Sequence, residues 1–354
     1  MADILQLRSS KPVAVWLIIG VVMLIVQILL GGITRLTGSG LSITEWNVIT
    51  GTLPPLNNHQ WLIEFEKYRQ TPQYQLLNTD FTIADFKFIF FWEWFHRFWA
   101  RLIGIVFAVP FIVFLVQRRF KSEMVKPLLI LFLLGALQGA VGWIMVASGL
   151  TGDAVYVKPA RLALHFIFAM GLLCYTFWFA LELWVPKNKL TFNPSLKKFI
   201  WIILSLLVIQ LIYGALMAGH KAATAAYTWP DINGSFFPHH MFGAPAGLLN
   251  LIENKITIHF IHRNLAYIIF LLLVAWSVKA FSFKGSSFFN RNKKWPLILV
   301  SLQVALGVFS VMASIQIVPN HWGVFEWMAQ LHQTVAMLLL LSLVAMIFIL
   351  RKRV

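Results

Sequence analysis

Eight long runs of apolar residues constrain this chain more than any other feature of its sequence. They lie near residues 13–33, 88–117, 127–147, 161–184, 197–218, 256–280, 295–317 and 326–350. Each run can cross about 30 Å of hydrocarbon as a helix that rises about 1.5 Å per residue. Charged residues make up only 12% of the chain, about half the share in soluble domains. We therefore predict an all-α integral membrane protein with eight transmembrane helices.

Lysine and arginine residues predict how these helices are oriented. The second, fourth and sixth connections and the C-terminal end carry basic clusters, whereas the connection between runs seven and eight has no Lys or Arg. Because cytoplasmic connections are rich in these residues, we expect both termini in the cytoplasm and the odd-numbered connections outside. The net charge of +16 is spread over these clusters. We therefore expect membrane lipid, and no nucleic acid, as a partner.

The two halves of the chain resemble each other. The matched features are Gln27 and Gly31 with Gln210 and Gly214, His96-Arg97 with His262-Arg263, and Leu137-Gln138 and Gly142 with Leu302-Gln303 and Gly307. Both halves are predicted to start inside, so the repeat is parallel rather than inverted. We predict two pseudo-symmetric four-helix bundles, residues 1–190 and residues 191–354.

Four histidines lie in the even-numbered runs at places related by this repeat. His96 matches His262 at an offset of 166 residues, and His165 matches His332 at an offset of 167 residues. All four fall near the outer end of their runs, so each bundle should hold two facing imidazoles in the outer half of the membrane. Two imidazoles at one level suit axial ligation of a haem iron. Structural histidines, a proton relay and a zinc site are the alternatives, and the pairs lack the further ligands that zinc requires.

A carboxylate distinguishes the two halves. Glu93 lies three residues before His96 and on the same helix face, whereas His259 occupies the matching place in the second half. An acidic side chain in an apolar, aromatic segment is costly and usually functional. We predict that Glu93 is catalytic and handles protons, the alternative being a structural carboxylate that bonds an arginine. We expect no ligand role for His259.

Arginines close to these histidines are candidate partners of haem propionates. Arg97 and Arg263 directly follow His96 and His262, and guanidinium groups form charge-assisted hydrogen bonds with carboxylates. Contact with lipid headgroups is the alternative. Arg35 and Arg161 are further candidates for the same role.

At this point the residues resemble a known family. Glu93-Trp94-Phe95-His96-Arg97 is similar to the E-x-x-H-R motif of the haem A synthase family. The segments 32–46 and 54–56 resemble its first-loop signature, and the segment 228–234 resembles its fifth-connection signature. The resemblance covers nearly the whole chain. One branch of the family has a cysteine pair in an outer loop; with Cys174 alone, this chain resembles the cysteine-free branch of proteobacteria and mitochondria.

The resemblance implies a fold, a cofactor and a reaction. The family has two four-helix bundles and holds a haem b in the C-terminal one, where His262 and His332 would ligate its iron. The substrate, haem O, would lie between His96 and His165, and the motif glutamate falls on Glu93. The implied oxidoreductase converts a porphyrin methyl group through a hydroxymethyl stage to the formyl group of haem A, for terminal oxidases.

The resemblance also implies a multi-pass protein of the bacterial inner membrane, with haem O synthase or oxidase-assembly proteins as candidate partners.

Two functions of other classes remain as alternatives, and a third is excluded. A di-haem b electron-transfer cytochrome explains the four histidines, but it does not explain why Glu93 occurs in one half only. A transporter is compatible with a parallel repeat, although no run is broken near its middle. The prenyltransferase that makes haem O needs Asp-rich magnesium motifs, and the aspartates here show no such pattern.

Overall fold

The structure is a computed structural model that describes residues 2–46, 50–243, 245, 247–319 and 321–352. Its long helices are α1 (Ala2–Leu36), α4 (Ile83–Val116), α5 (Ser122–Ala147), α6 (Pro159–Trp184), α7 (Pro194–Gly219), α9 (Lys255–Ser282), α11 (Trp295–Ala313) and α12 (Val324–Ile349). Within these described ranges, eight helices are long and apolar enough to cross a membrane, and they coincide with the eight predicted runs. The prediction of an all-α, eight-span protein is confirmed.

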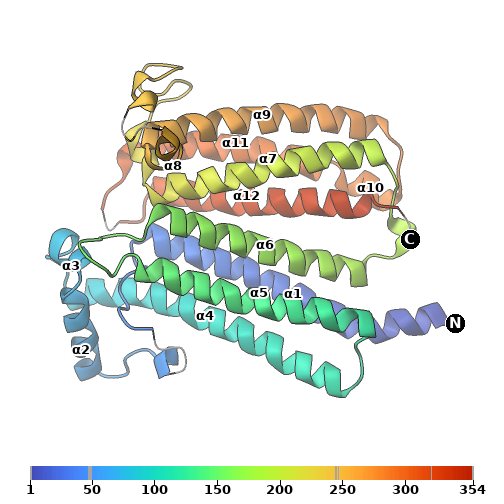
Figure 1. Ribbon diagram of the computed structural model, residues 1–354, viewed down its shortest axis with the longest axis horizontal. Coiled ribbons are helices and arrows are strands. Elements are labelled where there is room, and N and C mark those ends of the chain that lie inside the picture. The colour runs from blue at the N-terminus through green and yellow to red at the C-terminus, as the bar shows by residue number, and fades with distance from the viewer. Residues whose placement is uncertain (1, 47–49, 244, 246, 320, 353–354) are drawn as a thin grey trace.

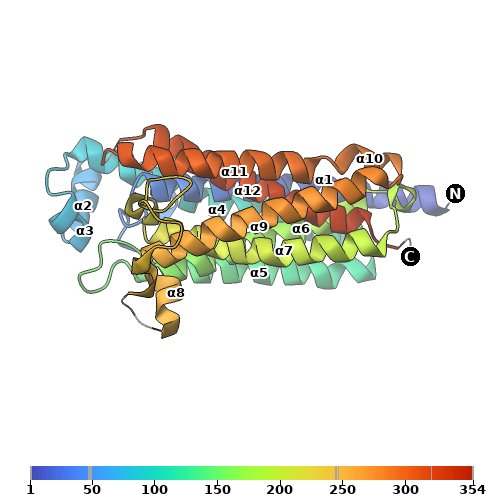
Figure 2. The ribbon, with the colours of Figure 1, turned by 90° about the horizontal axis from the view of Figure 1, so that it is seen from above.

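The long helices run roughly parallel and form two groups (Figures 1 and 2). Helix α1 packs on α4 and α6, and α5 packs on α6. In the second group α7 packs on α9 and α12, and α11 packs on α9 and α12. The groups meet where α6 contacts α7 and α12, and where α1 contacts α12.

One apolar core joins the two groups. Its fully buried members include Leu17 of α1, Leu173 of α6, Ile200 of α7, Trp276 of α9 and Phe348 of α12. These residues lie toward the end of the molecule that carries both termini.

Local capping signals explain where several helices begin. Thr82 and Asp85 form a capping box at the start of α4, in which each side chain bonds the other residue's backbone N–H. The helix therefore starts five residues before the apolar run that begins near residue 88, and its first turns project beyond its neighbours (Figure 1). At the starts of α7 and α9, the side-chain oxygens of Asn193 and Asn254 accept hydrogen bonds from backbone N–H groups of the first helical turn.

The connections at the projecting end contain short helices that the sequence did not reveal. The first connection holds η1 (Thr50–Thr52), α2 (Asn58–Arg69) and α3 (Pro72–Leu77), and the fifth holds η3 (Ala222–Ala225), η4 (His239–Phe242), η5 (Gly247–Leu249) and α8 (Asn250–Glu253). Helix α2 packs against α4 through Tyr68, Phe86 and Phe90. Burial in this aromatic cluster raises the pKa of Tyr68 to about 12.

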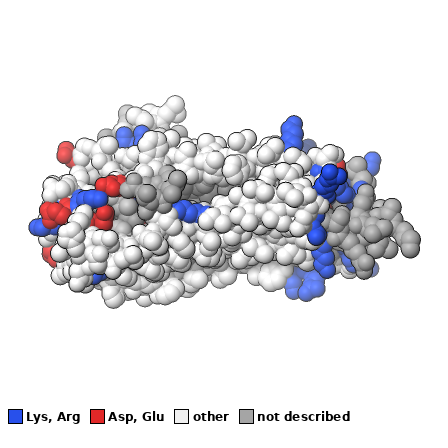
Figure 3. Space-filling model, turned by 90° about the horizontal axis from the view of Figure 1, so that it is seen from below, with Lys and Arg blue, Asp and Glu red and all other residues white. Residues whose placement is uncertain are grey.

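Basic residues gather at the opposite end. Both described chain ends lie there (Figure 1), together with η2 (Lys187–Lys189) and α10 (Ser287–Asn292). On the face in Figure 3, Lys and Arg side chains cluster at this end, and the broad middle of the bundle is almost free of charge. This distribution suits a membrane protein, while the predicted cytoplasmic placement of the termini stays a prediction.

Candidate functional site

A cavity of about 1190 Å³ lies between the helices and extends through both groups. All four predicted histidines line it: His96 and His165 in the first group, His262 and His332 in the second. Glu93 lines it as well. The tertiary structure thus gathers five side chains that are spread over 240 residues of sequence around one space.

The C-terminal histidines face each other across this cavity. The ring centres of His262 and His332 lie 6.3 Å apart, and the ring planes are inclined by 69°. A metal–imidazole bond of about 2 Å on each side, with each ring centre about 1 Å further out, predicts about 6 Å for two imidazoles on one metal ion. The spacing therefore fits axial ligation of an iron atom between the two rings.

The tautomer of His332 also suits a ligand. Its Nδ1–H donates to the backbone carbonyl of Gln303 at 3.0 Å, so the proton is on Nδ1 and the lone pair is on Nε2. Such a bond from the second ring nitrogen is the usual arrangement of a metal-bound histidine. In the described part of the chain, no three His, Cys, Asp or Glu side chains group as a metal site.

The N-terminal histidines occupy the corresponding places in the first group. His96 of α4 and His165 of α6 are close enough to interact electrostatically. A Cβ atom added to Gly31 would lie 3.4 Å from Nε2 of His96, and one added to Gly142 would lie 2.9 Å from Cε1 of His165. Both rings therefore rest directly on the backbone of a neighbouring helix.

Glu93 is buried and held by three donors. One carboxylate oxygen accepts from Nη2 of Arg97 at 2.6 Å, and the other accepts from the Ser42 hydroxyl at 2.7 Å and from the Ile43 backbone N–H at 2.9 Å. Only 2% of the residue is exposed. The carboxylate is thus fixed between α4 and the connection from α1 to α4, one turn from His96.

Arg97 also fastens this connection to the bundle. It donates to the backbone carbonyls of Ile43 at 3.1 Å and Glu45 at 3.0 Å, and its guanidinium lies 5.0 Å from the ring centre of Trp46. Sequence reasoning placed Arg97 beside its histidine, but it did not reveal these contacts because they join residues about 50 positions apart.

Arg263 does the same for the fifth connection. Its Nε donates to Nδ1 of His259 at 3.0 Å, and its Nη atoms donate to the carbonyls of Ala226, Thr228 and Asp231. The Thr228 hydroxyl, and then the Gly234 N–H, hold the pKa of the Asp231 carboxyl below its usual range. These hydrogen bonds hold the fifth connection against α9.

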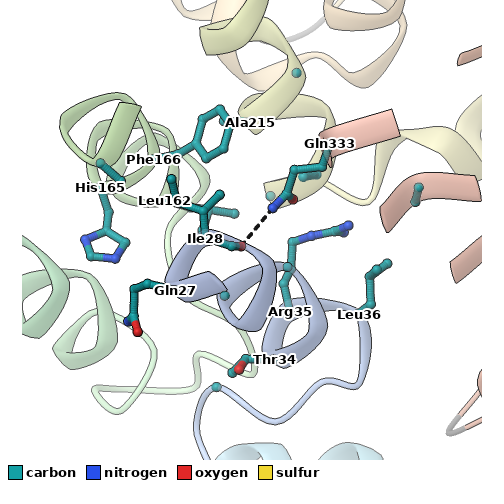
Figure 4. A pocket seen from close by; sticks show the side chains of 18 of the residues that line it. Gln27, Ile28, Thr34, Arg35, Leu36, Leu162, His165, Phe166, Ala215 and Gln333 are labelled. Atoms are coloured by element: carbon teal, nitrogen blue, oxygen red, sulfur yellow. Dashed lines mark hydrogen bonds between the residues drawn. The ribbon is translucent and has the colours of Figure 1, made fainter. Parts of the chain in front are cut away.

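Arg35 differs from the other candidate arginines. Arg35 lines the cavity, its Nε is buried, and it makes no hydrogen bond or ion pair within the described ranges. Figure 4 shows its guanidinium on the side of Gln333 from α12, away from His165. Glu326 at the start of α12 is its charged neighbour. Arg161, by contrast, is outside the cavity lining and donates to the carbonyl of Ile144 at 2.9 Å.

The fold and the site together define a multi-pass membrane protein with two histidine pairs around an internal cavity. Residues 14–344 match the family of cytochrome oxidase assembly proteins designated COX15-CtaA, and the chain belongs to this family.

Curated relatives of similar length support this assignment. The chain is 38% identical over 338 residues to a haem A synthase of Flavobacterium psychrophilum, which covers 94% of this chain and 96% of the relative. It is 41% identical over 343 residues to a haem A synthase of Novosphingobium aromaticivorans, with 94% and 93% covered. A third haem A synthase, from Rhodospirillum centenum, is 40% identical over 312 residues, with 87% and 83% covered. The family expected from the sequence is confirmed.

Proposed function

We propose that this protein is a haem A synthase, an oxidoreductase that converts the methyl group of haem O through a hydroxymethyl stage to the formyl group of haem A. The relatives' names support this function for the chain as a whole. The observation that carries it is the asymmetry within one cavity. Two matched histidine pairs line this cavity, and among the described residues only the N-terminal pair has a buried carboxylate one turn away along the same helix.

The C-terminal half, residues 191–354, is the candidate cofactor half. His262 and His332 would hold haem b, since their 6.3 Å ring separation fits two imidazoles on one iron atom. When bound there, haem b supplies one-electron transfer. The chain's own contribution is to present one imidazole from α9 and one from α12 to the same cavity.

The N-terminal half, residues 1–190, is the candidate substrate half. His96 and His165 would position haem O, and Glu93 would accept a proton as the methyl carbon is oxidised. Ser42, Ile43 and Arg97 fix the position of this carboxylate, so the substrate meets a pre-set acceptor rather than a mobile side chain.

Among the arginines, Arg35 is the best candidate for a porphyrin propionate. It is the one of the four that lines the cavity without a hydrogen-bonding partner in the described chain. Arg97 and Arg263 would contribute mainly by fastening the outer connections over the cavity, and Arg161 would contact lipid headgroups.

The proposed setting is the bacterial inner membrane, with the histidine pairs in the outer half of the bilayer. The basic end would face the cytoplasm, as the positive-inside rule requires. Haem O is a membrane-soluble substrate, so haem O synthase or an oxidase-assembly protein is a reasonable neighbour within the bilayer.

The first experiment is to express the chain in a host that makes haem O, purify it, and identify the extracted haems by mass. We expect haem b together with haem O or haem A. His262→Ala should remove haem b, whereas His96→Ala should remove the haem O and haem A signals. Two haems b per chain, with no altered haem, would instead support the di-haem cytochrome, and a protein without haem would refute the ligand assignment.

A further inference from the structure

One short pattern occurs four times in the cavity wall. A glutamine is followed four residues later by a glycine on each of the helices α1, α5, α7 and α11. The four pairs are Gln27 with Gly31, Gln138 with Gly142, Gln210 with Gly214, and Gln303 with Gly307. Each faces the histidine of the next long helix in the sequence, and these are His96, His165, His262 and His332.

The glycines let the imidazoles approach the helix backbone. A Cβ added to Gly307 would lie 2.9 Å from Cε1 of His332, and one added to Gly214 would lie 3.3 Å from Cε1 of His262. Real Cβ atoms almost never come closer than 3.0 Å to another heavy atom. The histidine must therefore move if Gly307 becomes any other residue.

The glutamines hold the same histidines through their amide N–H groups. Nε2 of Gln27, Gln138 and Gln210 donates to the backbone carbonyl of the facing histidine, at 3.3, 3.1 and 3.0 Å respectively. A carbonyl oxygen can only accept, so the N–H side of each of these amides must point toward the histidine.

Three of the four glutamine amides also contact a ring nitrogen of the facing histidine. Nε2 of Gln303 lies 3.1 Å from Nε2 of His332, whose proton is on Nδ1. The Gln303 amide therefore donates to the lone pair that an iron atom would use. Gln210 meets Nε2 of His262 at 3.4 Å, and Gln138 meets Nδ1 of His165 at 3.1 Å.

The amide oxygens complete the pattern. Oε1 of Gln27, Gln138, Gln210 and Gln303 is buried in every case and has no hydrogen-bond partner within the described ranges. A buried amide oxygen without a donor is unfavourable, and packing alone does not explain why it occurs four times at matched places.

We propose that the four glutamines are positioning residues for the haem-iron ligands. The amides of Gln138, Gln210 and Gln303 contact a ring nitrogen and keep the imidazole turned into the cavity. With the ring on a haem iron, Gln27, Gln138 and Gln210 would still hold the histidine through its backbone carbonyl, and Gln303 would support the edge of the His332 ring. The inference rests on the proposed function, because it requires that the histidines bind haem.

The test uses the full chain, expressed in a host that makes haem b but no haem O. Gln303→Met and Gln210→Met keep the length of the side chain and remove its polar atoms. We expect each variant to bind haem b about 10- to 100-fold more weakly, as is typical when an outer-shell partner of a ligand is lost. The ferric low-spin electron paramagnetic resonance spectrum and the midpoint potential of the remaining haem should shift, because the ring orientation changes.

A second glycine supplies the control. Gly142→Ala should weaken haem O binding at His165 in a host that makes haem O, whereas Gly171→Ala on α6 should not, since Gly171 is outside the cavity lining and nothing lies within 4 Å of a Cβ there. Both variants should retain haem b. Equal haem O binding by the two variants would contradict the close packing of His165 against Gly142.

The outcomes separate this inference from the proposed function. Glutamine variants with wild-type haem b content, spectrum and potential would overturn the positioning role while leaving the function in place. A wild-type protein that binds no haem b would overturn the function itself, and the inference with it. If one of the two glutamine variants aggregates, the haem b content, spectrum and potential of the other test the positioning role.

Discussion

At the scale of single residues, the two halves differ most clearly at one position. Arg97 and Arg263 each bond the side chain four residues earlier, but this partner is the carboxylate of Glu93 in one half and the imidazole of His259 in the other. Both arginines also bond backbone carbonyls of the connection that precedes their helix. The arginine-bonded side chain one turn from a histidine is therefore a carboxylate only in the N-terminal half, where we propose that the substrate binds.

Glu93→Gln should remove this negative charge with little change in shape. We expect haem A formation to fall about 100-fold or more, the usual range for a lost general acid or base, while haem b content stays normal. Haem A formed per mole of purified enzyme gives the measurement. Ser42→Ala, which removes one of the three donors to the same carboxylate, should have a smaller effect. Normal haem A formation by Glu93→Gln would exclude a proton-transfer role.

At the scale of elements, α1 connects the two candidate haem sites. Gln330 and Gln333, on either side of His332, donate across the group boundary to the α1 carbonyls of Leu29 at 3.1 Å and Ile28 at 3.0 Å. Figure 4 shows the second of these bonds. The same turn of α1 packs against His96 through Gly31. This turn of α1 therefore contacts His96 of the first candidate site and the two glutamines that flank His332 of the second.

Gly32→Ala tests this junction. A Cβ there would lie 2.4 Å from Oε1 of Gln330 and 2.8 Å from Nε2 of Gln333, so both side chains would have to leave their α1 partners. Losing two interhelical hydrogen bonds should lower the free energy of unfolding of a membrane protein by about 1–2 kcal/mol. We expect a lower thermal midpoint in detergent for Gly32→Ala. Gly104→Ala on α4, where a Cβ meets nothing within 4 Å, should melt like the wild type; equal midpoints for the two variants would argue against the junction.

At the scale of the whole molecule, basic charge and the histidine pairs are separated along the long axis. Basic side chains gather at the end that carries the termini (Figures 1 and 3), whereas the four histidines lie in the N-terminal halves of α4, α6, α9 and α12, toward the other end.

Cysteine labelling of intact cells tests the orientation. In a Cys174→Ala background, Gln75→Cys on α3 and Lys187→Cys in η2 both place a thiol at an exposed position at opposite ends of the molecule. The positive-inside rule predicts that a membrane-impermeant maleimide labels Gln75→Cys in intact spheroplasts and labels Lys187→Cys only after lysis. The reverse pattern would invert the predicted topology.

The sequence alone determined the class of fold, the family and the candidate ligands. Apolar runs of membrane length must form helices because the bilayer offers no partner for free backbone groups, so the eight spans could be predicted from composition along the chain. The histidines and Glu93 could be found because the internal repeat exposes both what the halves share and where they differ.

Only the tertiary structure decided what these residues contact. The Glu93 bonds to Ser42 and Ile43, the loop contacts of Arg97 and Arg263, and the cavity position of Arg35 depend on side chains brought together from distant segments. The glutamines were visible in the sequence only as markers of the repeat, since sequence spacing does not show which helix faces which. Contacts between helices are set by packing, and packing is a property of the folded chain rather than of any one segment.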